Sequence, residues 1–268
     1  MSEFICPVCK HKLNKSESQY VCTQGHSFDV SKDGYVNLLM SQQSSAKRHG
    51  DDKLMVRSRR DFLEKGFYKS LSNKLCETVK NYVNPHSVIV DVGCGEGYYS
   101  NAISKVILTD FYGVDISKDA LRYASRSMKE GQFAVASAFN LPFEDSAVDC
   151  VLNIFAPSAY NEFYRVLKEN GLLIKSVPLE EHLWGLKSVL YDKPYKNKPE
   201  IRNEELFELV SETEIKYEIN LTDSEDILNL FRMTPYYYKT SREDAEKLIN
   251  QKELTTIVHF CVEVYRKR

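Results

Sequence analysis

The run Val88–Val92 is apolar except at Asp91 and leads directly into the glycine-rich turn Gly93–Gly97. An apolar run of this length suits a strand that is buried on both faces of a parallel sheet. Glycines after such a strand allow a tight turn and let a ligand approach the backbone closely. The feature predicts a strand, a turn and a helix of an α/β fold, with a nucleotide-containing ligand at the turn.

Strand and helix patterns alternate along the following residues. We expect strands at 88–92, 112–115, 133–138, 147–155 and 171–177, and helices at 98–104, 118–128 and 158–168. Ser117 is a suitable N-cap for the second of these helices. Repeated strand–helix units of this length indicate a parallel sheet with helices on both faces, so the expected fold class is α/β and Rossmann-like.

The flanking regions are less regular. The spacing of apolar residues predicts helical structure over 56–83, with a break around Gly66. Residues 178–205 are rich in Pro, Lys and Tyr and are expected to form an insertion over the strand ends. The C-terminal part returns to strand at about 214–221 and 255–265.

Three details of the glycine turn favour S-adenosylmethionine over a nicotinamide nucleotide. The glycine spacing is G-x-G-x-G rather than G-x-G-x-x-G. Asp91 precedes the turn and can fix it or meet an ammonium group. Asp115 ends the second strand, where a carboxylate can accept hydrogen bonds from both ribose hydroxyls. The segment 138–143, which contains Leu141, fits the loop beside an adenine ring.

A second chemical site lies near the start of the chain. Cys6, Cys9, Cys22 and His26 form a C-x2-C-x12-C-x3-H pattern, which is typical of a tetrahedral zinc site. His11 is a rival fourth ligand, although a single residue between it and Cys9 strains the chelate. Four protein ligands leave no open position for water, so we expect one structural zinc ion that contributes about 10–16 kcal/mol to folding the module.

Composition limits the classes of protein to consider. The chain has 268 residues, room for one large domain and an appendage, and a net charge of −2. Its other cysteines are Cys76, Cys94, Cys150 and Cys261, which suit buried apolar positions better than a disulfide framework. No segment resembles a secretory signal or a membrane span. We therefore expect a cytoplasmic protein that has no membrane partner.

Positive charge gathers locally in the expected linker and at the start of the first expected helix. The basic residues are Lys47, Arg48, Lys53, Arg57, Arg59 and Arg60, and the opposing ones are Asp51 and Asp52. Such a patch can bind a polyanion even when the net charge is near zero. A solvated linker and helix face explains it equally well, so both interpretations stay open.

Several motifs together resemble one family, the bacterial 23S rRNA (guanine-N1)-methyltransferases of the RlmA/TlrB type. The similarity runs nearly end to end. It includes the Cys/His cluster and the segments 28–39, 59–63, 92–99, 141–143, 155–157, 182–187 and 233–235. The resemblance implies a zinc-binding RNA-recognition module at 1–40, a linker at 41–55 and a methyltransferase domain at 56–268.

The resemblance also implies a reaction and its site. The family methylates one guanine in a 23S rRNA hairpin, and its subgroups choose different neighbouring guanines. A homodimer stays open. By position, Tyr68, Gly95, Glu96 and His182 resemble cofactor contacts of the family, with Asp115 as the ribose ligand. The expected cofactor site also includes Asp91, Gly93, Gly97 and Leu141 from the glycine turn and the adenine loop. We expect a Cys6→Ala change to abolish RNA modification while cofactor binding is retained.

The sequence identifies no catalytic base. Asn153, Glu180 and Glu181 are candidates to accept the N1 proton of guanine. The segment 153–157 stands where other base-modifying methyltransferases carry an Asn/Asp-Pro-Pro-Tyr motif, which this chain lacks. Aromatic candidates to stack on a flipped base are Phe155, Trp184 and the cluster Tyr236, Tyr237 and Tyr238.

Two other functions compete with this one. A small-molecule methyltransferase of the quinone or sterol type shares the glycine turn and the Leu-Pro-Phe segment, but it needs no zinc module. A zinc-bearing RNA-binding protein with a vestigial cofactor fold would not need Asp91, Glu96 and Asp115 together.

Overall fold

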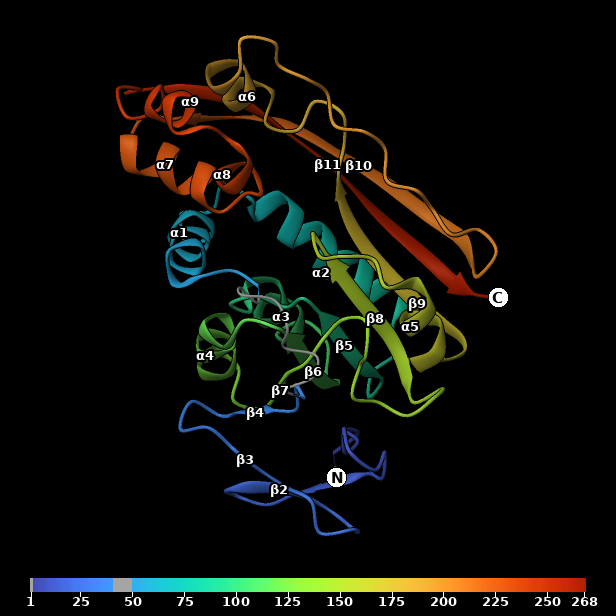
Figure 1. The fold of residues 1–268 in the computed structure, drawn as a ribbon. Coiled ribbons are helices and arrows are strands. Elements are labelled where there is room, and N and C mark those ends of the chain that lie inside the picture. The colour runs from blue at the N-terminus through green and yellow to red at the C-terminus, as the bar shows by residue number, and fades with distance from the viewer. Residues whose placement is uncertain (1, 41–49) are drawn as a thin grey trace.

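The computed structural model describes residues 2–40 and 50–268, and its centre is a sheet of eight strands (Figure 1). The strand order is β10 (Phe207–Leu221), β11 (Leu254–Lys267), β9 (Leu167–Pro178), β8 (Val148–Ile154), β5 (Val88–Val92), β6 (Asp110–Asp115), β7 (Gln132–Val135) and β4 (Tyr35–Asn37). The strands from β9 to β4 run parallel to their neighbours, and β11 and β10 add an antiparallel edge. The α/β class expected from the sequence is confirmed.

The helices of the described chain are α1 (Lys53–Glu64), α2 (Lys69–Tyr82), α3 (Tyr98–Ser104), α4 (Lys118–Ser127), α5 (Tyr160–Val166), α6 (Trp184–Leu190), α7 (Ser224–Arg232), α8 (Tyr236–Lys239) and α9 (Arg242–Glu246). The expected break at Gly66 separates α1 from α2, and this glycine has φ +85°. The Ser117 hydroxyl caps α4 by accepting from the Ala120 N–H, as predicted. None of the described helices is long and apolar enough to cross a membrane.

Chain order reverses at β5. Successive strands β5, β6 and β7 step toward one edge of the sheet, and β8 then returns to the opposite side of β5. In open α/β sheets, ligands bind outside the carboxyl ends of the strands at such a reversal. The ends of β5, β6 and β8 are therefore the expected place for the cofactor.

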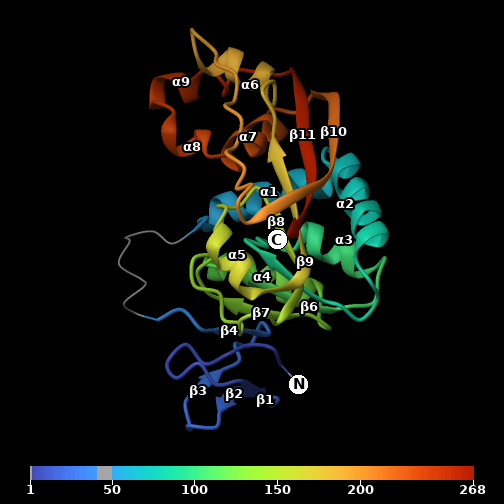
Figure 2. The same ribbon diagram turned by 90° about the vertical axis from the view of Figure 1, so that its right-hand side faces the viewer.

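The C-terminal part differs most from the sequence prediction. β10 begins at Phe207 rather than near residue 214, and α7, α8 and α9 connect it to β11. These three helices and α6 gather beyond the carboxyl ends of the parallel strands (Figures 1 and 2). The sequence pattern had predicted none of them. α8 and α9 have only four and five residues and bury no side chain, whereas α7 buries an apolar face that includes Ile227, Leu230 and Phe231.

The N-terminal segment lies at the other end of the molecule (Figure 2). Its three-stranded antiparallel sheet contains β1 (Leu13–Lys15), β2 (Gln19–Cys22) and β3 (Ser27–Asp29). β4, from the same expected module, pairs with β7 of the main sheet. α1 starts at Lys53, inside the expected linker, whose residues 41–49 lie outside the described chain. The division at 1–40, 41–55 and 56–268 stays a prediction.

An aromatic cluster joins this N-terminal segment to the main sheet. The Phe4 ring lies 5.1 Å from the ring of Tyr112, 5.3 Å from Phe143 and 5.9 Å from Tyr20, measured between centroids. All four side chains are almost fully buried. The Tyr20 hydroxyl donates to Gln132 at the start of β7. The segment therefore shares a core with the main sheet.

We expect Phe4→Ala to lower the free energy of unfolding by about 3–5 kcal/mol, because it removes a fully buried ring and leaves a cavity between two sheets. Urea denaturation with zinc present measures the change. Val8→Ala serves as the control, since Val8 is 50% exposed and should change stability by less than about 0.5 kcal/mol. Equal stability of the two variants would show that the shared core contributes little.

Candidate functional site

The four predicted metal ligands come together. One donor atom each from Cys6, Cys9, Cys22 and His26 lies within 4.8 Å of all the others. The Cys9 and Cys22 sulfurs are 3.5 Å apart, and His26 Nδ1 lies 3.4 Å from Cys22 Sγ and 3.6 Å from Cys6 Sγ. The edges of a tetrahedron with Zn–S bonds of about 2.3 Å measure about 3.8 Å. Spacing and donor chemistry thus fit one zinc ion.

Two similar turns position these ligands. In the first, the Lys10 N–H donates to the Cys6 carbonyl at 2.9 Å, and Lys10 has φ +63°. In the second, the Gly25 N–H donates to the Cys22 carbonyl at 2.9 Å, and Gly25 has φ +81°. His11, the rival ligand, is exposed, and its Nδ1 contacts the Cys9 carbonyl at 3.1 Å. His26 is the histidine that the fold brings to the sulfurs.

The glycine turn follows β5 and begins α3, as predicted. Gly93, Gly95 and Gly97 all have positive φ. A Cβ atom on Gly93 would lie 2.4 Å from Cβ of Ala156, so only glycine lets the turn after β8 approach so closely. A Cβ on Gly97 would lie 2.9 Å from Cα of Ala124 in α4. These glycines serve packing as well as ligand approach.

Three carboxylates surround this turn. Burial raises the pKa of Asp91 to about 7, and it also raises the pKa of Glu96 and Asp115 above the usual range. The two oxygens of Asp115 accept from the N–H groups of Gly95 at 2.9 Å and Ser117 at 2.7 Å, which fixes the carboxylate at the end of β6. A buried acidic site favours a ligand of net positive charge. S-adenosylmethionine carries such a charge, whereas the phosphates of a nicotinamide nucleotide would be repelled.

Arg59 also belongs to this site, which sequence reasoning missed. Its guanidinium pairs with Asp51, donates to the Met233 carbonyl at 3.1 Å and lowers the pKa of Glu96 against the effect of burial. The sequence left Arg59 open between a basic patch for a polyanion and a solvated helix face. The fold instead turns it toward the glycine turn, where a Cβ on Gly95 would lie 3.8 Å from its Nη1.

Two other arginines of that basic patch pair with an acidic neighbour on α1. Arg57 and Arg60 both pair with Asp61, and the Arg60 guanidinium lies over the ring of Tyr123. Lys47 and Arg48 lie outside the described residues. The paired arginines favour the interpretation of a solvated helix face over that of an RNA-binding patch.

Buried polar atoms without partners mark where a ligand fits. Asp91 accepts from the Ser100 hydroxyl at 2.5 Å through one oxygen, but its other oxygen has no partner among the described residues. The Tyr68 hydroxyl, also buried, has no partner in the same part of the chain. Such groups cost free energy until a ligand satisfies them. The ammonium and carboxylate of a methionine moiety would supply the missing partners.

His182 lies in the same aromatic surroundings. Its ring centroid is 4.4 Å from that of Phe260 and 6.1 Å from that of Tyr68. Burial lowers the pKa of His182 to about 3, so the ring is neutral at neutral pH. His182 Nδ1 accepts from the His259 N–H at 3.3 Å, which assigns the proton to Nε2. His182 can therefore act as a hydrogen-bond donor, but it is too weakly basic for proton abstraction.

The N-terminal segment helps to hold the loop that contains Leu141. The Leu141 N–H donates to Glu162 at 2.7 Å, and Arg165 donates to the Leu141 carbonyl at 3.0 Å. From the other side, the Ile5 N–H donates to the Pro142 carbonyl at 2.9 Å. The metal-binding segment therefore lies against the loop that is expected beside the adenine ring.

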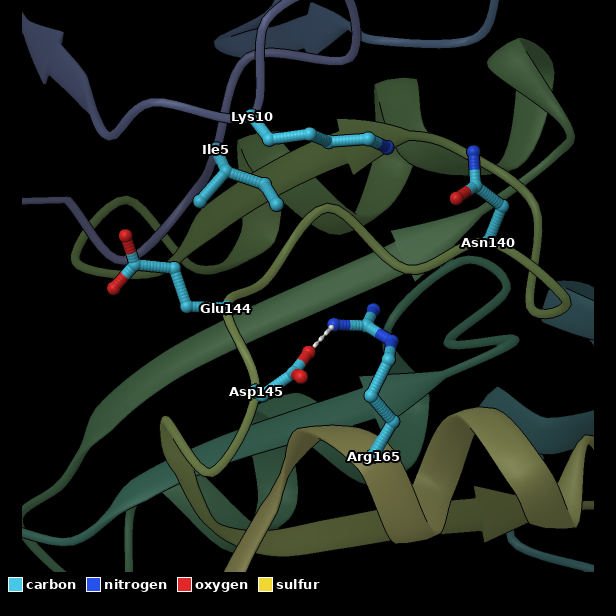
Figure 3. Close-up of a pocket in the computed structure, with 6 residues that line it drawn as sticks. All are labelled: Ile5, Lys10, Asn140, Glu144, Asp145 and Arg165. Carbon is cyan, nitrogen blue, oxygen red and sulfur yellow. Dashed lines mark hydrogen bonds and ion pairs between the residues drawn. The ribbon is translucent and has the colours of Figure 1, made fainter.

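A cavity of about 350 Å³ opens at this junction (Figure 3). Lys10 extends over it toward Asn140, and Arg165 rises from α5 to pair with Asp145. The Arg165 guanidinium already contacts two carboxylates and two carbonyls. Residues of both parts of the chain line the cavity, and none of its lining residues belongs to the glycine turn.

The proposed proton acceptors are engaged elsewhere. Asn153 donates to the Pro157 carbonyl at 3.3 Å and accepts from the Ser158 hydroxyl at 3.4 Å, which supports the end of β8. Glu180 pairs with Lys196, and Glu181 pairs with Lys216. The structure assigns a general base to none of them.

Comparison with known proteins gives a consistent result. Residues 4–47 match the family described as RlmA, N-terminal, a zinc ribbon, and residues 90–175 match a family of methyltransferase domains. YxjB of Bacillus subtilis strain 168, provisionally named a 23S rRNA (guanine-N1)-methyltransferase, is 33% identical over 266 residues, which cover 94% of this chain and 92% of YxjB. The 23S rRNA (guanine(748)-N(1))-methyltransferase of Streptomyces fradiae is 34% identical over 192 residues, 69% of this chain and 66% of that enzyme.

Solved structures support the fold. The YcgJ protein of Bacillus subtilis superposes with a TM-score of 0.51 at 16% identity, over 73% of this chain and 98% of YcgJ. A crystal structure from Bacillus halodurans C-125, titled a methyltransferase, gives a TM-score of 0.50 at 16% identity, over 74% of this chain and 98% of that chain. At this identity, the likeness concerns the fold alone.

We expect the purified protein to carry one zinc ion per chain. Cys22→Ser should weaken zinc affinity by at least about 100-fold, because four ligands share about 10–16 kcal/mol of apparent binding free energy. His11→Ala is the matched control and should retain the metal, since His11 lies outside the cluster. Elemental analysis after gel filtration measures the metal. Loss of zinc in His11→Ala would contradict the ligand assignment.

The contacts at Ile5 change one earlier expectation. Because the Ile5 N–H holds the Pro142 carbonyl, we now expect zinc removal to weaken S-adenosylhomocysteine binding several-fold rather than to spare it. Calorimetry on zinc-loaded and chelated protein measures this. Equal affinity of the two forms would show that the cofactor loop is held without the module.

Proposed function

Since the chain belongs to the 23S rRNA (guanine-N1)-methyltransferases, we propose that it transfers a methyl group from S-adenosylmethionine to N1 of one guanine in a hairpin of 23S rRNA. The enzyme combines a Rossmann-like methyltransferase domain with a zinc ribbon. The names of the relatives specify 23S rRNA, and the location of the guanine in a hairpin is our proposal. A homodimer also stays a prediction, which light scattering after gel filtration can test.

The observation that carries the proposal is the zinc ribbon docked beside the cofactor loop. Phe4 and Ile5 reach the segment Pro142–Phe143 from a module that a small-molecule methyltransferase does not need. The exposed residues Lys10, Lys12 and Lys15 give this module cationic groups close to the main sheet, although Lys12 pairs with Glu3. A module at this place supports a large, folded and anionic substrate.

We further propose the roles of individual residues in holding the cofactor. Asp91 would meet the ammonium group, Asp115 the ribose hydroxyls, and Leu141 the edge of the adenine ring. The glycine turn with Glu96 would enclose the centre of the cofactor, and Tyr68 and His182 would offer hydroxyl and Nε2–H donors. The burial, the orphaned oxygen of Asp91 and the positions at the strand ends support this assignment.

The chemistry needs orientation above all. When bound, S-adenosylmethionine supplies an electrophilic methyl group that is displaced in line by guanine N1. The chain contributes by fixing both reactants at close distance. Guanine N1 carries a proton at neutral pH, so a proton acceptor should assist. That acceptor stays unassigned, because the side chains of Asn153, Glu180 and Glu181 already interact with other residues of the chain.

Comparison of 23S rRNA from cells with and without the gene tests the function. Primer extension should stop at one N1-methylated guanine in the parent strain and read through it in the deletion strain. Mass spectrometry of the same RNA identifies 1-methylguanosine. Unchanged guanine methylation in the deletion strain would contradict the rRNA substrate, and methylation of a small quinone by the purified enzyme would favour the alternative. The ribosomal substrate also predicts a cytoplasmic protein in a bacterium.

Cofactor binding should depend on pH through Asp91. The raised pKa of about 7 means that the carboxyl becomes protonated as the pH falls below 7, and the protonated form cannot pair with an ammonium group. We expect affinity for S-adenosylhomocysteine to fall about eightfold between pH 7.5 and pH 6, because binding requires one proton to leave. Calorimetry measures this change. Asp91→Asn should bind more weakly and show a flatter pH profile, and a wild-type affinity independent of pH would remove Asp91 from this role.

A further inference from the structure

The turn after β8 presents an aromatic ring in an unusual way. Phe155 has φ +56°, a strained backbone conformation that is rare for a bulky side chain. Its side chain is 43% exposed, although Ile154 directly before it is buried. The Phe155 N–H donates to the Ser176 carbonyl at 3.2 Å, which holds the turn against β9. Packing therefore maintains a strained conformation that leaves an aromatic ring accessible.

This ring lies beside the cofactor turn. Ala156, the next residue, approaches Gly93 so closely that a Cβ on Gly93 would lie 2.4 Å from it. The Phe155 ring centroid lies 4.8 Å from that of Phe260 and 6.3 Å from that of Tyr99, the second residue of α3. Residues from β8, β11 and the helix after the glycine turn thus meet at one place.

Two hydroxyls in these surroundings have no hydrogen-bond partner among the described residues. They belong to Tyr99, whose ring contacts Phe155, and to Ser176, whose carbonyl accepts from Phe155. Both oxygens are buried, so each represents an unsatisfied donor and acceptor. Both groups can donate to or accept from a ligand that enters these surroundings.

The other aromatic candidates belong to α6 (Trp184) and to α8 (Tyr236, Tyr237 and Tyr238). Tyr237 lies against Phe231 at 5.6 Å and against Tyr238 at 5.2 Å, and the Tyr236 hydroxyl donates to Asn197 at 3.2 Å. These residues belong to the α7–α8 region, whereas the turn that carries Phe155 directly contacts Gly93. Phe155 is the better placed stacking surface.

We propose that Phe155 is the surface on which the flipped target guanine stacks, with the hydroxyls of Tyr99 and Ser176 facing its hydrogen-bonding edge. This inference rests on the proposed function. A base within a hairpin stem must leave the helix before a methyl group can reach N1, and an aromatic side chain compensates for the lost stacking. Phe155 is thus a substrate-binding residue that sets the position of the base beside the cofactor.

The test compares Phe155→Leu, Phe155→Tyr and Tyr82→Leu with the wild type on a transcribed 23S rRNA hairpin. Phe155→Leu should lower kcat/KM about 10- to 100-fold, because stacking of a base on an aromatic ring is lost. Phe155→Tyr should stay within about threefold of the wild type, since it keeps the ring. Tyr82→Leu is the control, because this exposed tyrosine ends α2 just before the start of β5, at the opposite end of the strands.

Calorimetry with S-adenosylhomocysteine separates base positioning from cofactor binding. Phe155→Leu should bind it within about twofold of the wild type. Lost cofactor affinity in Phe155→Leu would overturn the inference, because it would place Phe155 in the cofactor site. Unchanged methylation by Phe155→Leu would also overturn it. A wild-type enzyme that methylates no RNA would instead contradict the proposed function.

A second variant covers the case in which Phe155→Leu does not fold. Tyr99→Phe keeps the ring packing and removes only a hydroxyl that has no partner among the described residues. It should fold as the wild type does and lower kcat/KM about 3- to 10-fold, as expected for one lost hydrogen bond to substrate. Unchanged kcat/KM in Tyr99→Phe would overturn the role of the hydroxyl, and a loss with intact cofactor affinity would support the site.

Discussion

A shared aromatic core joins the metal-binding segment to the main sheet. The four metal ligands close two turns, which lets a segment with little apolar surface adopt one conformation. The segment then buries Phe4 against Tyr112 and Phe143 and places Ile5 beside Pro142. As a result, the loop beside the expected adenine position has the metal site on one side and Arg165 on the other. We therefore expect metal binding, sheet packing and cofactor binding to depend on one another.

The acidic cofactor turn has a different physical basis. Burying several carboxylates raises their pKa values and disfavours their ionised forms. Arg59 and the backbone N–H groups of Gly95 and Ser117 offset part of this cost. The part of the cost that these groups do not offset can be met by a cofactor that carries a sulfonium and an ammonium group. Electrostatics and the topological reversal at β5 thus favour the same ligand at the same strand ends.

Much of the central fold could be predicted because its signals are local. The apolar run before Gly93 predicted β5, the glycine at 66 predicted the break between two helices, and Ser117 predicted the start of α4. The helices α7 to α9 and the first half of β10 were missed. α8 and α9 are too short to show a helical period, and helices of this length depend on tertiary packing rather than on propensity.

The sequence by itself determined the two chemical motifs, the glycine turn and the metal-binding cluster. The residues within each turn are close along the chain, so their spacing sets the geometry of the turn. Only the tertiary structure decided which distant side chains join them. It turned Arg59 toward the cofactor turn and away from a basic patch, joined Phe4 to the core of the sheet, and left Phe155 accessible beside Gly93. Such contacts arise from packing between strands and helices far apart in sequence, where no spacing rule applies.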